Sequence, residues 1–242
     1  VRLSILFLIA SHLILPIVFF ISGSNKQKDK ITSLCWMLMT SAWTAYMFAT
    51  GRWDWLGYYL RYALLAGLLM AIVRAYRNNR QAPLWPGPSW TSWGRIVIPG
   101  VLTVAFLFMA VISIGGRGYS GEAVALHFPL KDGTYYVAHG GSIPVINYHN
   151  DYLPQQFALD ISKLNGWGSR AAGLLPDDLH RYAIYGDRLY SPCSGVVRKA
   201  VDGFPDRLPS DFANGLPEGT PAPGNHVAID CGGVQVYIAH MQ

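Results

Sequence analysis

The chain has 242 residues, of which 51% are hydrophobic and only 14% are charged, and its formal net charge is +5. An ordinary soluble domain carries about 25% charged residues, so this composition indicates a membrane protein. The charge is uneven, because residues 1–116 hold ten basic and two acidic residues, whereas residues 117–242 hold nine basic and twelve acidic ones. The basic excess lies in the apolar half, which leaves no basic surface on the second half for nucleic acid.

Four apolar runs in the first half approach the length of about 20 residues that crosses a bilayer as a helix. They are residues 3–21, 31–49, 56–73 and 96–114. The first run lacks a basic start and a small-residue cleavage site, so we interpret it as a retained helix and not as a signal peptide. The sequence therefore predicts a transmembrane region of four helices over residues 1–116.

The loops between these runs predict an orientation. Basic residues follow the first run and lie between the third and the fourth: Lys26, Lys28, Lys30, Arg74, Arg77, Arg80 and Arg95. Because positively charged loops stay in the cytoplasm, residues 117–242 are expected outside it. His12 and Arg61 fall within the runs, and each is either a functional group or an ordinary side chain that bonds a neighbouring helix or reaches the interface.

Residues 117–242 alternate short β-type segments with clusters of turn residues, which indicates a mainly antiparallel β domain. Strands are predicted at residues 134–138, 144–148, 156–161, 189–200 and in a hairpin at 227–238. A short helix is predicted to open at Pro176 and to run to Ala183. The fold class expected for the whole chain is multi-domain, with a four-helix transmembrane segment followed by this β domain.

The predicted hairpin has the clearest pattern in the second half. Apolar residues alternate on both sides of Gly232-Gly233, which predicts a two-residue turn. With that turn Asn225, and not His226, pairs opposite His240. His240 falls on the aliphatic face of the second strand, where a histidine either fills a core position or points into a polar site.

Three stretches together resemble the lysostaphin/LytM-type zinc peptidases, which cut peptide cross-links in bacterial cell walls. The first is Gly224–Gln242, with a Gly-Asn-x-Val-x-Ile strand, a glycine turn and Tyr-x-Ala-His-Met. The second is Tyr185–Val197, which contains Ser-Pro-Cys-Ser-Gly-Val-Val, and the third is Gln156–Ile161. They follow one another in the family's order, and the resemblance implies a LytM-like β-sheet core.

The resemblance implies roles for individual residues. Asp160 matches a zinc-binding aspartate of the family, and His240 matches a catalytic histidine that is not a zinc ligand. Gln156 stands where the family has its first zinc-binding histidine, and an amide is a poor zinc ligand. The family's later His-x-His pair would lie beyond Gln242, so the β domain is expected to be incomplete at its C-terminus.

His149 is a candidate for the vacant ligand position. If the strands around residues 150–155 pair as an antiparallel hairpin, His149 and Gln156 face each other with Cβ atoms about 5 Å apart. The alternative is a surface histidine in a turn, and the alternative for Asp160 is a turn cap. His139 and His226 remain open as further site residues.

The function implied by the resemblance is zinc-assisted hydrolysis of peptidoglycan cross-link or stem peptides. Zinc, held by Asp160 and His149, would polarise the carbonyl and lower the pKa of a bound water, while His240 would bond the oxyanion or move a proton. The expected location is the bacterial inner membrane, with several spans and a periplasmic C-terminal domain. The alternative is a catalytically degenerate domain that binds cell-wall peptides or a partner, which Gln156 favours.

Two cysteines are expected to form a disulfide. Cys193 and Cys231 flank turns and would lie in an oxidising compartment. A shared metal is the alternative, but the spacing is not Cys-x-x-Cys. Cys35 falls within the second apolar run and is expected to act as a small apolar side chain.

Overall fold

The computed structural model describes residues 2–85, 87 and 90–241. The chain divides into two compact units. Arg2–Ser120 and Val137–Ile161 form one, which we call the helical unit, and Gly121–Tyr136 with Ser162–Gln242 form the other, the sheet unit. The sequence placed the whole of residues 117–242 in the β domain, whereas the structure groups residues 137–161 with the helices.

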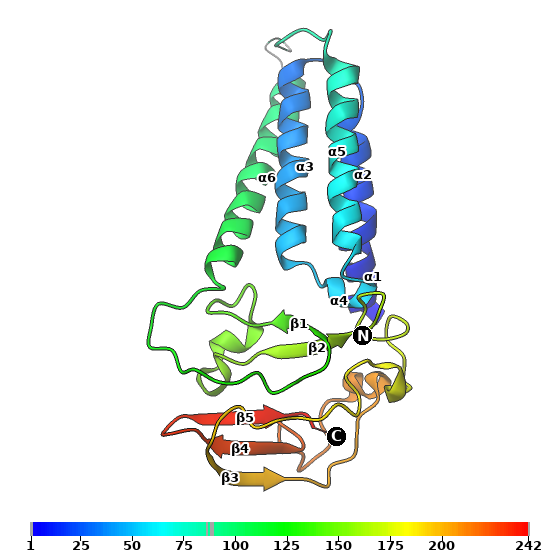
Figure 1. Cartoon of the computed structure of the whole chain (residues 1–242). Coiled ribbons are helices and arrows are strands. Elements are labelled where there is room, and N and C mark those ends of the chain that lie inside the picture. The colour runs from blue at the N-terminus through cyan, green and yellow to red at the C-terminus, as the bar shows by residue number, and fades with distance from the viewer. Residues whose placement is uncertain (1, 86, 88–89, 242) are drawn as a thin grey trace. The chain divides into compact units, whose positions relative to one another are not determined.

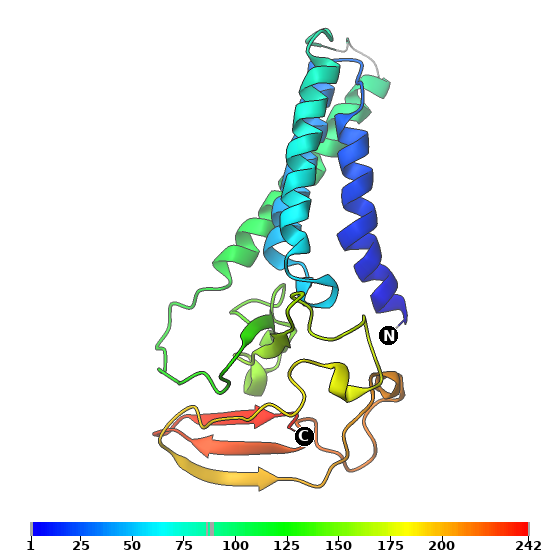
Figure 2. The ribbon, with the colours of Figure 1, turned by 45° about the vertical axis from the view of Figure 1, so that its right-hand side comes forward.

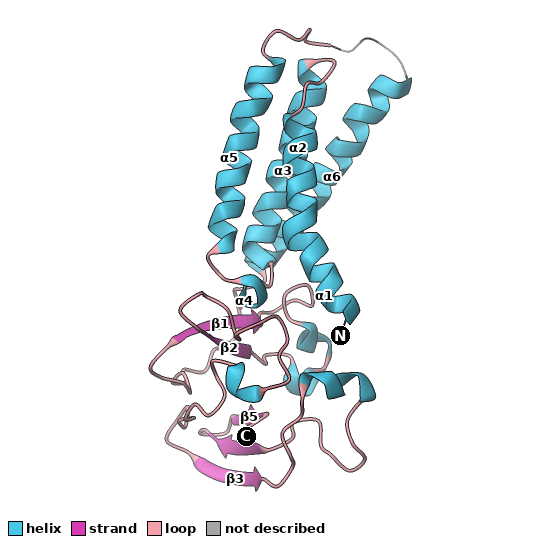
Figure 3. Ribbon diagram, turned by 90° about the vertical axis from the view of Figure 1, so that its right-hand side faces the viewer, coloured by secondary structure: helices cyan, strands magenta, loops and turns pink. Residues whose placement is uncertain are grey.

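The helical unit is an antiparallel bundle (Figures 1 and 3). Its elements are α1 (Arg2–Ile9), the π-helical turn η1 (Ala10–Ile14), α2 (Leu15–Ser24), α3 (Lys30–Thr50), the short α4 (Trp53–Leu56), α5 (Leu60–Asn79) and α6 (Trp90–Gly115). The first three form one continuous helix, and the π turn relieves the clash between the ring of Pro16 and the carbonyl of His12 one turn earlier. Helix α3 packs against α2, α5 and α6.

Two helices, and not the four expected, are long and apolar enough to cross a membrane among the described residues. They are Leu3–Ser24 and Ser92–Gly115. Helices α3 and α5 form close to the predicted runs, but α3 carries threonines and serines, and α5 ends in a basic turn that contains Arg77. The hydroxyls in α3 bond back to carbonyls one turn earlier, as Thr44 does to Thr40 at 2.8 Å. These polar groups lower the mean hydropathy of both helices.

The core of the helical unit lies where α3 ends and α5 begins. Met47, Trp53 and Leu64 are buried there. The indole N–H of Trp53 donates to the carbonyl of Met47 at 2.9 Å, which fixes α4 against the last turn of α3. The loop of residues 51–59 is therefore held rigidly at this end of the bundle.

Residues 137–161 cover the same end of the bundle (Figures 1 and 2). The backbone N–H of Ser142 donates to the carbonyl of Gly116 at 2.7 Å, and its hydroxyl donates to the same carbonyl at 3.0 Å. A Cβ on Gly141, where φ is +124°, would lie 2.7 Å from that carbonyl oxygen, so only glycine permits the approach. The guanidinium of Arg117 donates to the carbonyl of Ala49. The segment is thus attached to the end of α6, which Arg117 in turn joins to the end of α3.

β1 (Thr134–His139) and β2 (Asp160–Leu164) form a two-stranded sheet and run in opposite directions (Figure 1). The predicted strand at 134–138 is confirmed, and the one predicted at 156–161 begins only at residue 160. The strand predicted at 144–148 is wrong. A turn leads there into the 3-10 helices η2 (Tyr148–Asp151) and η3 (Leu153–Gln155). The Asn147 side chain accepts a hydrogen bond from the N–H of His149, which begins the 3-10 turn in place of a strand.

The sheet unit contains the antiparallel sheet β3 (Val196–Val201), β4 (His226–Asp230) and β5 (Gln235–Ala239). The predicted hairpin and its register are confirmed, because His226 lies opposite Ala239 and the turn is Gly232-Gly233. The described strands form two small antiparallel sheets, and the LytM-like sheet core stays a prediction. Strand β3 is shorter than predicted, and the helix predicted at 176–183 is reduced to the 3-10 helix η4 (Leu179–Arg181).

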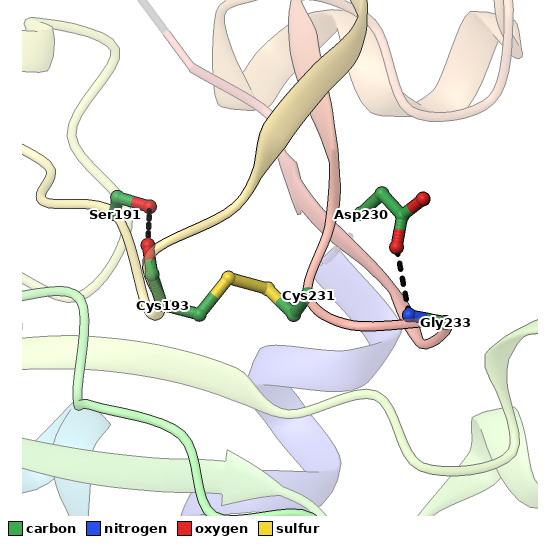
Figure 4. Close-up of a disulfide and its surroundings, with 5 residues drawn as sticks. All are labelled: Ser191, Cys193, Asp230, Cys231 and Gly233. Atoms are coloured by element: carbon green, nitrogen blue, oxygen red, sulfur yellow. Dashed lines mark hydrogen bonds between the residues drawn. A yellow bond between two sulfur atoms is a disulfide. The ribbon is translucent and has the colours of Figure 1, made fainter.

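The disulfide between Cys193 and Cys231 is confirmed, with 5.8 Å between the two Cα atoms (Figure 4). It joins the segment before β3 to the end of β4. The Ser191 hydroxyl donates to the carbonyl of Cys193 at 2.7 Å, and the N–H of Gly233 donates to Asp230 at 2.9 Å in the adjoining turn. Cys35 is a free thiol in α3.

Candidate functional site

One buried amide folds the segment that carries the predicted metal ligands. The side chain of Asn147 is fully buried, and its NH2 group donates to the carbonyls of Gly141 and Gln156, both at 2.9 Å. Its oxygen accepts from the N–H of His149 at 3.1 Å. These three bonds close the loop on itself, so residue 149 comes to lie beside the start of β2.

His149 and Asp160 meet as the sequence predicted, although not for the predicted reason. The Nε2 atom of His149 lies 3.0 Å from Oδ1 of Asp160, and its Nδ1 lies 3.1 Å from Oε1 of Gln155. The segment between His149 and Asp160 does not form a strand hairpin, and the turn residue that contacts His149 is Gln155, not Gln156. The His149 side chain is 15% exposed and that of Asp160 is 38% exposed, so the pair is open to a ligand on the carboxylate side.

Two aromatic rings flank this pair. The Tyr148 ring lies 3.9 Å from the His149 ring, and it meets the His139 ring edge-on at 4.8 Å. Burial, followed by the negative charge of Asp160 and a hydrogen bond to it, raises the pKa of Tyr148. The tyrosine hydroxyl thus stays protonated beside Asp160.

The polar contacts continue from His139 into the bundle. Nη1 of Arg52 lies 2.9 Å from Nε2 of His139, and its Nε and Nη2 donate to the two oxygens of Asp54, each at 2.9 Å. Arginine only donates, so Nε2 of His139 accepts and the ring is neutral with its proton on Nδ1. We call this set the junction cluster. Its members are Arg52, Asp54, His139, Tyr148, His149 and Asp160.

The contact between Arg52 and His139 predicts a pH dependence. Burial, and then the Arg52 charge, lower the pKa of His139. The unfolded ring binds protons more readily, so the stability of the neutral contact is complete above pH ~6.5 and is lost as the pH falls towards the lowered folded pKa. We expect the melting temperature to fall between about pH 7 and pH 5. This fall in melting temperature should be smaller in His139→Gln, and in the exposed control His180→Gln it should equal that of the unmodified protein. An equal fall in all three proteins would contradict the role given to His139.

The pair offers part of a zinc site. Two ligands at 2.0–2.1 Å from a tetrahedral ion are about 3.3 Å apart, close to the observed His149–Asp160 separation. Zinc sites use at least three protein ligands. Among the described residues no group of three or more His, Cys, Asp or Glu side chains is placed to hold a metal ion. The described residues therefore do not complete a zinc site, and the metal roles of His149 and Asp160 stay predictions.

His240 belongs to the sheet unit, so it is not part of the junction cluster. It lies just past the end of β5 with φ +57°, and its N–H donates to the carbonyl of Pro223 at 3.0 Å. The strand ends before it, which removes it from the aliphatic face where the sequence placed it. His226 is buried and donates from Nδ1 to the carbonyl of Gly224 at 2.7 Å, which is a structural role.

Sequence reasoning missed Arg52, Asp54 and Tyr148. The signal that marks the first two is the sequence Arg-Trp-Asp-Trp just after an apolar run, where a charged pair needs internal partners.

His12 lies in the π turn near the same end of the bundle. Its Nδ1 contacts the Leu8 carbonyl at 3.1 Å and the Ser11 hydroxyl at 2.9 Å, and its ring meets Trp53 edge-on at 4.9 Å. A Cβ on Gly51 would lie 2.9 Å from its Nε2. The ring is therefore packed tightly between the first helix and the loop that carries Arg52.

No protein-family model, no characterised protein and no solved structure matches this chain. The resemblance to zinc peptidases accordingly rests on the motifs quoted above. The geometry of the junction cluster is the second, separate source for a functional argument.

Proposed function

We propose that the chain is a membrane-anchored, zinc-dependent endopeptidase that acts outside the cytoplasm on peptidoglycan cross-link or stem peptides. One observation supports it most. The Asp160 carboxylate, which the family motif singled out, and the imidazole of His149, the candidate for the vacant ligand position, lie 3.0 Å from each other on a partly open surface. That approach is what two ligands of one ion need, and it arises in a segment without regular strand pairing.

The membrane anchor in this proposal is the whole bundle in the bacterial inner membrane. The two apolar helices face lipid, and α3 and α5 complete the bundle, with the threonine hydroxyls of α3 bonded to its own carbonyls. Basic residues gather at the end away from the junction cluster, at the start of α3 and the end of α5. The positive-inside rule places that end in the cytoplasm and the junction cluster outside, where the Cys193–Cys231 disulfide is also stable.

In this function Asp160 and His149 would bind the zinc, and the catalytic role of His240, which belongs to the sheet unit, stays a prediction. The proposal requires at least one further protein ligand. It also requires His149 to release its contact with Asp160, because Nε2 cannot donate to a carboxylate and bind a metal at once.

A binding module for cell-wall peptides is the second candidate. His149 favours it, since both of its ring nitrogens already contact side-chain oxygens, those of Gln155 and Asp160. Such a pair can bind a peptide through the second carboxylate oxygen of Asp160 without any metal. Gln156, in the place of the family's histidine, agrees with this alternative.

Zinc content and peptide cleavage separate these functions. The protein is purified in detergent micelles, equilibrated with zinc, and assayed for bound metal and for cleavage of a synthetic cross-linked stem peptide. The peptidase proposal expects about one zinc per chain, and both metal and cleavage should be lost in Asp160→Ala. The matched control Asp151→Ala, an exposed carboxylate in the same segment, should keep both.

The remaining outcomes decide between the candidates. Peptide binding that is lost in Asp160→Ala, without zinc or cleavage, selects the binding module. A protein that neither binds the peptide nor cleaves it would contradict both.

A further inference from the structure

The His149–Asp160 pair is joined to the helices by direct contacts. Arg52, just beyond the end of α3, contacts His139. The Tyr148 ring contacts the rings of both His139 and His149, and His149 contacts Asp160. Four successive contacts of hydrogen-bond or ring-contact length put Asp160 on the order of 15 Å from Arg52. The position of the pair is therefore set by the end of α3.

A second attachment fixes the same segment to α6. Ser142 bonds the carbonyl of Gly116 through both its N–H and its hydroxyl, and its hydroxyl also donates to the carbonyl of Gly118 at 2.8 Å. Gly116 directly follows the last residue of α6. Two attachments on different helices prevent the segment from swinging away from the bundle.

Aromatic residues mark the level of the membrane surface at this end. The Arg61 guanidinium lies 3.8 Å from the centre of the Tyr58 ring and 4.6 Å from that of Phe48. Tyr59 and Tyr62 are exposed beside them. Tyrosine, tryptophan and arginine gather at the lipid headgroups, a layer about 5–8 Å thick on each side of the hydrocarbon core. Loop 51–59 thus lies at headgroup level, and the pair lies just above it.

We propose that the pair acts at the membrane surface, on peptides tethered to the bilayer by a lipid anchor. This deepens the proposed function and rests on it. A site fixed this close to the headgroups meets the first residues of a membrane-tethered peptide more often than peptidoglycan peptides that lie farther from the bilayer. A short tether also raises the local concentration of the peptide at that height to the millimolar range.

The test compares one peptide in three forms, with the full chain reconstituted in lipid vesicles. The cross-linked stem peptide is offered free, on a lipid with a short linker, and on the same lipid with a long flexible linker. We expect the short-linker form to be bound or cleaved at least about tenfold faster than the free form, and the advantage to shrink with the long linker. Equal rates for all three, or a faster reaction with the long linker, would overturn the proposal.

A second measurement tests the position of the site without any substrate. Leu153 is exposed in η3, close to the pair in sequence, and takes a spin label as Leu153→Cys in a Cys35→Ser background. Lipids with a nickel chelate on the headgroup should relax this label strongly. The relaxation should weaken when Arg52→Met removes the contact with His139 and Ser142→Ala removes the hydroxyl bonds of the second attachment. An unrelaxed label in the otherwise native protein would overturn the proposal.

The two measurements separate failure of this inference from failure of the function. A relaxed label together with equal rates for free and tethered peptide leaves the peptidase function and refutes the tethered substrate. A relaxed label with no binding or cleavage of any peptide refutes the function, and the substrate proposal with it.

Discussion

Replacing Asn147 by alanine is expected to destabilise the helical unit by about 4 kcal/mol, because the change leaves several buried backbone groups without partners. The amide bonds the carbonyls of Gly141 and Gln156 and the N–H of His149, and it is fully buried. Water does not replace these bonds at a buried position. The loss should appear in thermal unfolding in detergent and as faster amide exchange across residues 137–161.

Two control variants make this result specific. Asn147→Asp keeps the acceptor for His149 but lacks the donors for the two carbonyls, so it should be nearly as damaging as alanine. Asn150→Ala removes a neighbouring amide whose bond to the Gln156 carbonyl is long, at 3.5 Å, and should change stability little. Similar stability in all three variants would contradict the role given to Asn147.

Asp54→Ala is the second large effect, with an expected loss of about 3 kcal/mol. The carboxylate is fully buried and binds Arg52 through two hydrogen bonds, so its removal leaves a charge without its partner. This expected loss of stability is at the lower end of the range for broken buried ion pairs, because 26% of the Arg52 side chain is exposed and can be hydrated. Arg52 should also lose its orientation towards His139, which removes one attachment of residues 137–161.

The sheet unit provides the matched comparison. Arg198 and Asp230 form an ion pair at 2.7 Å, but the arginine is largely exposed. Arg198→Ala should shift the unfolding midpoint little, since exposed pairs contribute little to stability. If the two variants had the same effect, burial of Asp54 would not be the cause of its importance.

The apolar runs predicted the positions of the helices more reliably than their ability to cross a membrane. The run at 31–49 became α3 with its ends shifted by one residue, because Asp29 caps the first turn by accepting the N–H of Thr32 at 2.7 Å. The run at 56–73 became α5, which continues to Asn79, since arginine and asparagine prolong a helix although they end an apolar run. Composition alone could not show that the hydroxyls of α3 bond internally.

The candidate site was predicted in part. His149 and Asp160 were chosen for a resemblance and a hairpin, and they meet because Asn147 begins a 3-10 turn that no strand pattern reveals. The hairpin at Gly232-Gly233 was predictable down to its register because turn and alternation are both local signals. Arg52 and His139 are 87 positions apart and meet at 2.9 Å, and such a contact follows from tertiary packing alone.

A designed disulfide tests the central claim, that the segment carrying the pair is attached to the end of the helices. A Cβ on Gly116 would touch Cγ1 of Ile143, so the Cβ atoms of Gly116→Cys and Ile143→Cys would lie within about 4 Å, the spacing that a disulfide needs. Gly118→Cys with Ile143→Cys is the matched control, because a Cβ on Gly118 contacts only the Gly115 carbonyl. Both pairs are placed in a Cys35→Ser background, oxidised in membranes and digested with trypsin, which cuts at Arg117 and Lys131 between the two positions.

The attachment predicts that the fragments of the Gly116→Cys/Ile143→Cys protein stay joined until they are reduced, while those of the control separate. Fragments that separate in both proteins, or that stay joined equally in both, would contradict it.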